Sequence, residues 1–86
     1  MDKLSDFSSF ILSLASSAFY YMGESPNPSE GKEINLEIAK HTIDTITMLE
    51  NKTINNLSDK EKVLLNDVLY KLRTKFVKLK KEKGNN

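Results

Sequence analysis

The chain has 86 residues, enough for one small domain, and it contains no cysteine and a single histidine. This composition excludes disulfides, thiolate metal sites and sites with several histidines. A domain this short buries only about 60–65% of the surface of its unfolded chain, so small domains are often stabilised by disulfides, metals or oligomerisation. Of these, the composition leaves oligomerisation open.

The net charge of +1 hides an uneven distribution along the chain. Residues 1–70 hold 6 Lys/Arg and 11 Asp/Glu, a balance of −5, whereas residues 71–86 hold 7 Lys/Arg and one Glu, a balance of +6. A basic end on an acidic body raises the hypothesis that this end binds nucleic acid or another anionic surface.

The spacing of apolar residues predicts a first helix over about residues 5–22. Ser5 or Asp6 can cap its first turn, and Gly23 can end it in the left-handed conformation. Six residues form one apolar stripe, which we predict to be an oligomer interface: Phe7, Phe10, Ile11, Leu14, Ala18 and Met22.

Residues 7–23 carry no charge, which makes the other face of this helix unusual. It holds Leu12 and Phe19 among serines, whereas a solvated helix face normally carries charges. As a helix the segment would span roughly 25 Å, short of the ~30 Å hydrocarbon core of a membrane, and no basic segment typical of a signal peptide precedes it. We therefore expect a cytoplasmic protein without a membrane span. The helix is covered either partly by another chain or by its own three-helix fold.

Two prolines predict a loop over residues 24–34. A second helix is expected over residues 36–51, after Asn35 as its cap. Its predicted buried stripe has six members: Leu36, Ile38, Ala39, Ile43, Ile46 and Leu49. The opposite face is polar and holds Glu37, Lys40, His41 and Asp44.

Ser58 and Glu61 have the spacing of a capping box, in which each side chain accepts a hydrogen bond from the backbone N–H of the other residue. A third helix is expected over residues 59–81, followed by a disordered tail at 82–86. Its inward residues are Leu65, Val68, Leu69, Leu72, Phe76 and Leu79. The predicted fold is therefore all-α, a single three-helix domain over residues 1–86 that homo-oligomerisation completes.

An ordered set of residues between positions 7 and 77 matches a known pattern. Its members are Phe10, Ser13, Leu14, Ala15, Ala18, Gly23, Glu24, Asn35, Leu36, Ala39, Ile43, Asp44, Leu49, Lys52, Thr53, Asn56, Leu57, Ser58, Glu61, Leu65, Leu69, Leu72, Arg73, Phe76 and Val77. In this order they resemble the DUF1844 family, short bacterial proteins of unknown function. The resemblance implies a cytoplasmic bacterial protein and brings no activity, cofactor or assigned site.

Two positions depart from the pattern of that family, which often has glycine where Asn55 stands and arginine where Lys40 stands. Asparagine adopts the left-handed conformation more readily than most residues, so we expect the turn at Asn55 to be kept. Lysine in place of arginine would weaken a bidentate contact at position 40.

Glu37, His41 and Asp44 share one helix face by their spacing of three and four residues. They could form a small acid–base or metal cluster, but a solvated face with weak pairs is favoured, because no nucleophile, further ligand or oxyanion hole accompanies them. We therefore predict no enzyme, no metal and no cofactor. Asp44, Lys52 and Asn56 are candidates for docking a protein partner, and the alternative is that they serve helix ends and turns.

The predicted function is a non-enzymatic interaction or adaptor module that forms a homo-oligomer, most simply a dimer, and binds an unidentified protein. The alternative is a factor associated with RNA or the ribosome through its basic third helix and tail. The candidate phosphate contacts are Lys75, Lys78, Lys80, Lys81 and Lys83. Base stacking has little support, because Phe76 belongs to the core stripe.

Overall fold

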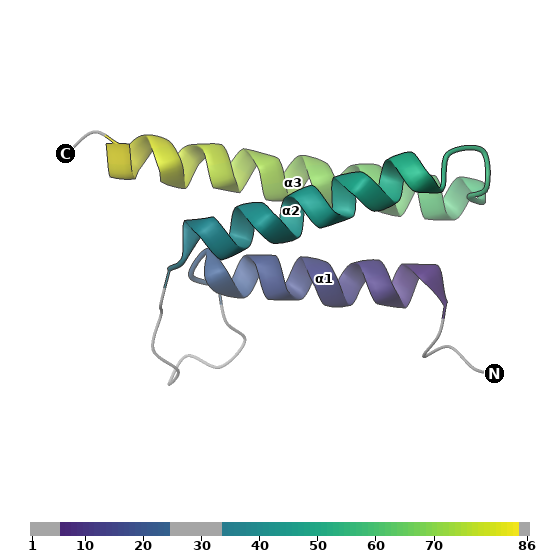
Figure 1. Cartoon of the computed structure of the whole chain (residues 1–86), viewed down its shortest axis with the longest axis horizontal. Coiled ribbons are helices and arrows are strands. Elements are labelled where there is room, and N and C mark those ends of the chain that lie inside the picture. The colour runs from purple at the N-terminus through teal and green to yellow at the C-terminus, as the bar shows by residue number, and fades with distance from the viewer. Residues whose placement is uncertain (1–5, 25–33, 85–86) are drawn as a thin grey trace.

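A computed structural model describes residues 6–24 and 34–84 of the chain. These residues form three helices and no strand: α1 (Phe7–Tyr21), α2 (Leu36–Lys52) and α3 (Asp59–Gly84). The helices run alternately in opposite directions along the length of the molecule, and each packs against the other two (Figure 1). The predicted all-helical, three-helix fold is confirmed.

Side chains cap the first turns of α1 and α2. Asp6 Oδ1 accepts a hydrogen bond of 2.8 Å from the backbone N–H of Ser9, and Asn35 Oδ1 accepts one of 3.1 Å from that of Ile38. Each bond satisfies a backbone donor that has no partner within the helix. Of the two caps predicted for α1, Asp6 is the one observed, and Ser5 lies outside the described residues.

The capping box predicted before α3 is present. Ser58 N–H donates to Glu61 Oε1 at 2.8 Å, and Glu61 N–H donates to Ser58 Oγ at 3.2 Å. The helix continues to Gly84, so the predicted end at residue 81 was too early, and residues 82–84 of the predicted tail are helical. Residues 80–83 are lysine and glutamate, which are good helix formers, and no proline interrupts them. Residues 85–86 lie outside the described part.

Two residues with positive φ end helices or shape turns. Gly23 has φ of +94° after α1, and a Cβ atom there would lie 3.3 Å from Ile34 Cγ1. Nearby, the N–H of Asn35 donates to the carbonyl of Tyr21 at 2.8 Å, which joins the end of α1 to the start of α2. Asn55 has φ of +70° between α2 and α3, as expected for a position where glycine is common. Residues 25–33, which include both prolines of the predicted loop, lie outside the described residues.

One continuous core lies between the three helices. Its buried apolar residues are Ile11, Ala15, Ala18, Met22, Ala39, Ile43, Ile46, Leu65, Val68, Leu69 and Leu72. The stripe predicted for α3 is confirmed, with Phe76 and Leu79 partly buried beside it. Ile38 was assigned wrongly to the buried stripe, since it is exposed, and Phe10 of the predicted interface stripe is exposed as well. Each lies one residue before a buried position, and neighbouring residues of a helix point about 100° apart.

Candidate interaction surfaces

Five of the six residues in the apolar stripe predicted as an oligomer interface face the core of their own chain, and the sixth, Phe10, is exposed. Ile11, Ala18 and Met22 are fully buried there, so they have no surface left for a second copy to cover, and their assignment to an interface was wrong. Phe7 and Leu14 are partly buried against the same core. The three-helix fold thus uses this stripe itself, because α2 and α3 together cover one side of α1.

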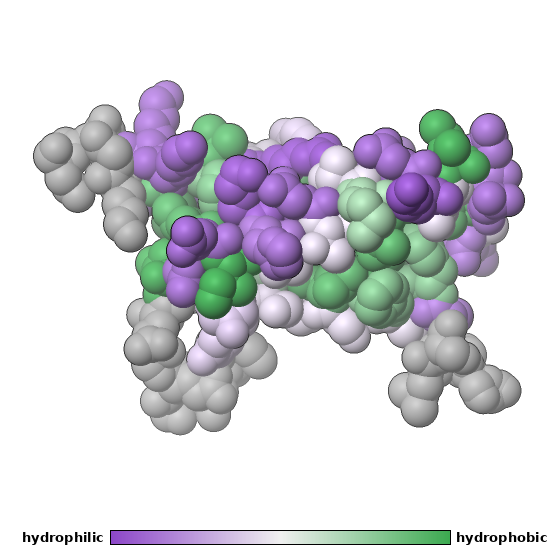
Figure 2. Space-filling view, in the orientation of Figure 1, coloured by the Kyte–Doolittle hydropathy of each residue, from purple (hydrophilic) through white to green (hydrophobic). Residues whose placement is uncertain are grey.

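The opposite side of α1 is a solvent-facing surface of uncharged residues. We call it the outer face of α1, and it consists of Phe10, Leu12, Ser13, Ser16, Ser17 and Tyr20. Phe10 is 50% exposed and Leu12 is 49% exposed. Neither the first nor the last turn of α1 carries an acidic or basic residue. In Figure 2 the strongly hydrophilic side chains gather over α2 and α3, whereas the lower edge, formed by α1, is white to green.

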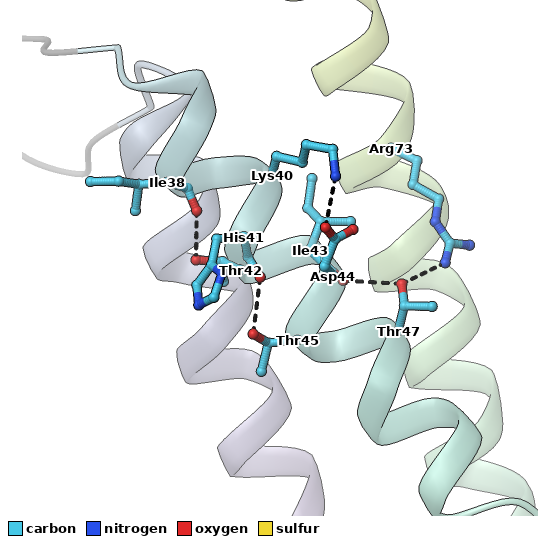
Figure 3. Close-up of polar contacts among 9 residues, drawn as sticks. All are labelled: Ile38, Lys40, His41, Thr42, Ile43, Asp44, Thr45, Thr47 and Arg73. Atoms are coloured by element: carbon cyan, nitrogen blue, oxygen red, sulfur yellow. Dashed lines mark hydrogen bonds and ion pairs between the residues drawn. The ribbon is translucent and has the colours of Figure 1, made fainter.

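A polar network joins α2 to α3. Lys40 Nζ lies 2.8 Å from Asp44 Oδ2 on α2 (Figure 3). Arg73 Nη2 on α3 donates to Thr47 Oγ1 at 2.8 Å, and the hydroxyl of Thr47 donates in turn to the carbonyl of Ile43 at 3.0 Å. The network borders a shallow groove of about 290 Å³ between the two helices. The bonds from Arg73 to Thr47 and from Thr47 to Ile43 hold this side of α2 against α3. The Asp44 carboxylate is already paired with Lys40.

The three candidate docking residues do not form one site. Asp44 borders the groove beside α3, whereas Lys52 is the last residue of α2, about 12 Å further along the helix axis at 1.5 Å per residue. Asn56 follows the turn, where its backbone N–H donates to the carbonyl of Thr53 at 2.9 Å. Lys52 and Asn56 are therefore placed as expected for a cation at a helix C-terminus and for turn chemistry.

A hollow of about 260 Å³ lies at the turn between α2 and α3. Its walls include Ile54, Asn55 and Leu57 from the turn and Lys62 and Leu65 from α3. This hollow was not among the sites predicted from the sequence. The signal was present at Asn55, because a residue in the left-handed conformation bends the chain sharply at this point.

The basic end of α3 is partly neutralised within the chain. Lys75 Nζ lies 2.8 Å from Glu24 Oε2, and Lys71 Nζ lies 3.1 Å from Asp67 Oδ2. The other candidate phosphate contacts with described side chains are exposed: Lys78, Lys80 and Lys81. At about 100° per residue these three point in different directions around α3, so they do not line one groove. The side chain of Lys83 lies outside the described part.

Glu37, His41 and Asp44 all lie on the exposed face of α2, as expected. Asp44 is turned toward Lys40 (Figure 3). Within residues 6–24 and 34–84, no group of three or more His, Cys, Asp or Glu side chains could hold a metal ion. None of the helices in the same residues is long and apolar enough to cross a membrane.

The sequence profile described as "Domain of unknown function (DUF1844)" matches residues 5–78, which include all of α1 and α2 and most of α3. The chain belongs to the DUF1844 family. No curated protein and no solved structure matches it. In this DUF1844 chain the matched residues include both the outer face of α1 and the network around Arg73, but only the first part of the basic end.

Proposed function

We propose that the protein is a non-enzymatic interaction module that forms a homo-oligomer and binds a helix of another polypeptide with the outer face of α1. The observation that supports the proposal is that Phe10 and Leu12 are half-exposed on a helix that carries no charge. A helix face that stays in water normally carries charged side chains, as α2 and α3 do here. On this proposal the protein acts in the cytoplasm of a bacterium.

The shape of the outer face suits a helix. Ser13, Ser16 and Ser17 are short, so a second helix can approach α1 closely, within the 8–10 Å that separate the axes of packed helices. By helical geometry Phe10 and Leu12 lie on either side of the serines, where they can contact the flanks of the incoming helix. Covering these two side chains removes apolar surface from water, which favours association by about 25 cal/mol for each Å².

Two measurements test this function. Light scattering of the full chain at micromolar concentration is expected to give at least twice the monomer mass of 9.8 kDa. Affinity capture from the native host is expected to recover one discrete protein with the wild type and to lose it with Leu12→Lys. The matched control is Ile54→Lys, which places the same charge on an exposed isoleucine in the turn between α2 and α3 and should keep the partner. Equal capture by both variants would contradict docking on α1.

A second candidate function is binding to RNA or to the ribosome. Its support is the exposure of Lys78, Lys80 and Lys81 near the end of α3, which extends beyond the ends of α1 and α2 (Figure 1). Recovery of ribosomal proteins in the capture experiment, rather than one discrete partner, would favour this candidate. The balance of −5 over residues 1–70 opposes it, because an acidic body repels a polyanion.

A further inference from the structure

Three large apolar side chains stand on the side of α3 that points away from the core, and one of them, Val77, also borders the groove between α2 and α3. Val63, Tyr70 and Val77 are 68%, 69% and 61% exposed, and with Ile54 they are the most exposed large apolar residues of the described part. We call these three the α3 row. Single apolar residues on a surface are ordinary. The α3 row differs because its members are seven residues apart and therefore lie on one side of the helix, where a second helix can contact all three.

Residues at equal distances before and after Tyr70 in the sequence are complementary to one another. Val63 and Val77 lie seven residues to either side of it, and Asp59 and Lys81 lie eleven residues to either side. A second α3 running in the opposite direction, with Tyr70 opposite Tyr70, therefore sets valine against valine and carboxylate against ammonium.

Polar positions agree with the same register. Asn66 and Thr74, both exposed, lie four residues to either side of Tyr70, so Asn66 of one copy comes level with Thr74 of the other along the pair. Asp67 and Lys71, an ion pair of 3.1 Å within α3, stand together on one flank of the row. A two-fold axis keeps this flank on the same side in both copies, so Asp67 of one copy comes beside Lys71 of the other.

We propose that two copies of the chain pair through antiparallel α3 helices, with a two-fold axis at Tyr70. This rests on the proposed homo-oligomer and assigns its interface to α3, leaving the outer face of α1 for the other partner. Residues 59–81 span about 33 Å at 1.5 Å per residue, so nearly the whole of α3 takes part. The antiparallel direction also sets the basic C-terminal half of each helix against the more acidic N-terminal half of its mate, which favours association.

The geometry of the helix fits such a pair. Residues seven apart drift by about 20° around a straight α-helix, and a left-handed supercoil of two helices compensates this drift. The core residues of α3, such as Leu65, Leu69 and Leu72, point to the opposite side of the helix. Pairing therefore covers only exposed side chains and requires no change within the three-helix fold.

Cysteine cross-linking tests the register directly, because the chain has no cysteine of its own. Tyr70→Cys is expected to form a disulfide between copies under mild oxidation, since position 70 faces itself across the axis. Val63→Cys alone is not expected to do so, because the two copies of position 63 would lie about 21 Å apart along the helices, far beyond disulfide reach. The double variant Val63→Cys/Val77→Cys is expected to link.

Charge reversal tests the same pairing without cross-linking. Lys81→Glu sets carboxylates against Asp59 at both ends of the seam and should weaken the dimer, whereas Asp59→Lys/Lys81→Glu should restore it. Tyr70→Lys should raise the dissociation constant of the dimer at least about tenfold. Because Tyr70 is exposed in the single chain, the helical circular dichroism should stay the same. The matched control is Leu12→Lys on α1, which should leave the dimer unchanged.

The outcomes separate this inference from the proposed function. A wild-type dimer that persists in Tyr70→Lys but is lost in Leu12→Lys would place the interface on α1 and overturn the α3 pair, while the homo-oligomer stands. If Val63→Cys alone forms a disulfide between copies, and the double variant gives no more cross-linked dimer than this single variant, the helices pair in parallel. This result would also overturn the inference. A wild-type monomer at every concentration would overturn both.

Discussion

Lys75 on α3 and Glu24 beyond the end of α1 form an ion pair, with Lys75 Nζ 2.8 Å from Glu24 Oε2. The Lys75 side chain is 29% exposed, so this pair is less solvated than the pairs of Lys40 with Asp44 and of Lys71 with Asp67. It brings a residue of the basic end into the fold and joins segments that are 51 positions apart in the sequence. One of the five candidate phosphate contacts thus has a structural partner.

Breaking this pair should have a small but measurable effect on stability. Glu24→Gln and Lys75→Gln are each expected to lower the free energy of unfolding by up to about 1 kcal/mol, with a coupling energy of about 0.5–1 kcal/mol, the upper part of the range for such pairs. Urea unfolding of both single variants and the double variant, at one protein concentration, measures the coupling. The pair of Lys40 and Asp44 is the control. Since it is more exposed, its coupling should be smaller, and a larger value there would contradict the argument.

Removal of the cap of α3 should destabilise the chain. Ser58→Ala deletes the oxygen that accepts the N–H of Glu61 and disturbs no packing, so we expect a loss of about 1 kcal/mol in the free energy of unfolding. Lys62→Ala, an exposed change one turn further along, should alter stability by less than about 0.5 kcal/mol. Equal stabilities of Ser58→Ala and wild type in urea would show that the cap does not hold the start of α3.

The stability of the chain should respond differently to substitution of the two positive-φ residues. Gly23→Ala places a Cβ atom in the left-handed conformation and within 3.3 Å of Ile34, so it should cost about 1 kcal/mol or more. Asn55→Gly keeps the conformation available and should change stability by less than about 0.5 kcal/mol. Thermal and urea unfolding measure both. A tolerated Gly23→Ala would contradict the role assigned to the left-handed residue after α1.

Much of this fold follows from local sequence signals. The caps at Asp6, Asn35 and Ser58 and the left-handed positions Gly23 and Asn55 were all expected, because each depends on the chemistry of a few neighbouring residues. The helix end at Gly84 was not, since no residue between 81 and 84 is a strong helix breaker until the glycine itself. Local signals therefore place a helix boundary where a cap or a left-handed residue marks it, and they miss a boundary such as that of α3 where neither does.

The interaction surfaces were harder to predict, for a physical reason. Periodicity shows that one side of a helix is apolar, but it does not show whether the same chain or another covers that side. Ile11 and Met22 satisfied the pattern and turned out to lie in the core of their own chain. The α3 row was visible as a seven-residue spacing of Val63, Tyr70 and Val77, yet it could be separated from the core stripe only once the side facing α1 and α2 was known.

RNA binding, if it occurs, should be weak and strongly dependent on salt. Each phosphate that a lysine neutralises on a single strand releases counterions, with a slope near −0.7 in a plot of log affinity against log salt, so contacts by the three exposed lysines would give about −2. Replacing Lys78, Lys80 and Lys81 by glutamine should abolish this binding and keep the fold, because all three side chains are exposed.

Lys75→Gln alone should change the affinity for RNA less than Lys78→Gln, because Lys75 is already paired with Glu24 and its charge is partly compensated. The control replaces Lys40 and Lys62 by glutamine, which removes exposed charges elsewhere and should leave the salt slope unchanged. Fluorescence anisotropy with unrelated single-stranded RNAs should then show similar, weak affinities for all sequences. Tight binding that persists at about 0.5 M salt exceeds what three phosphate contacts can sustain, and it would put RNA binding ahead of the interaction module as the function of this chain.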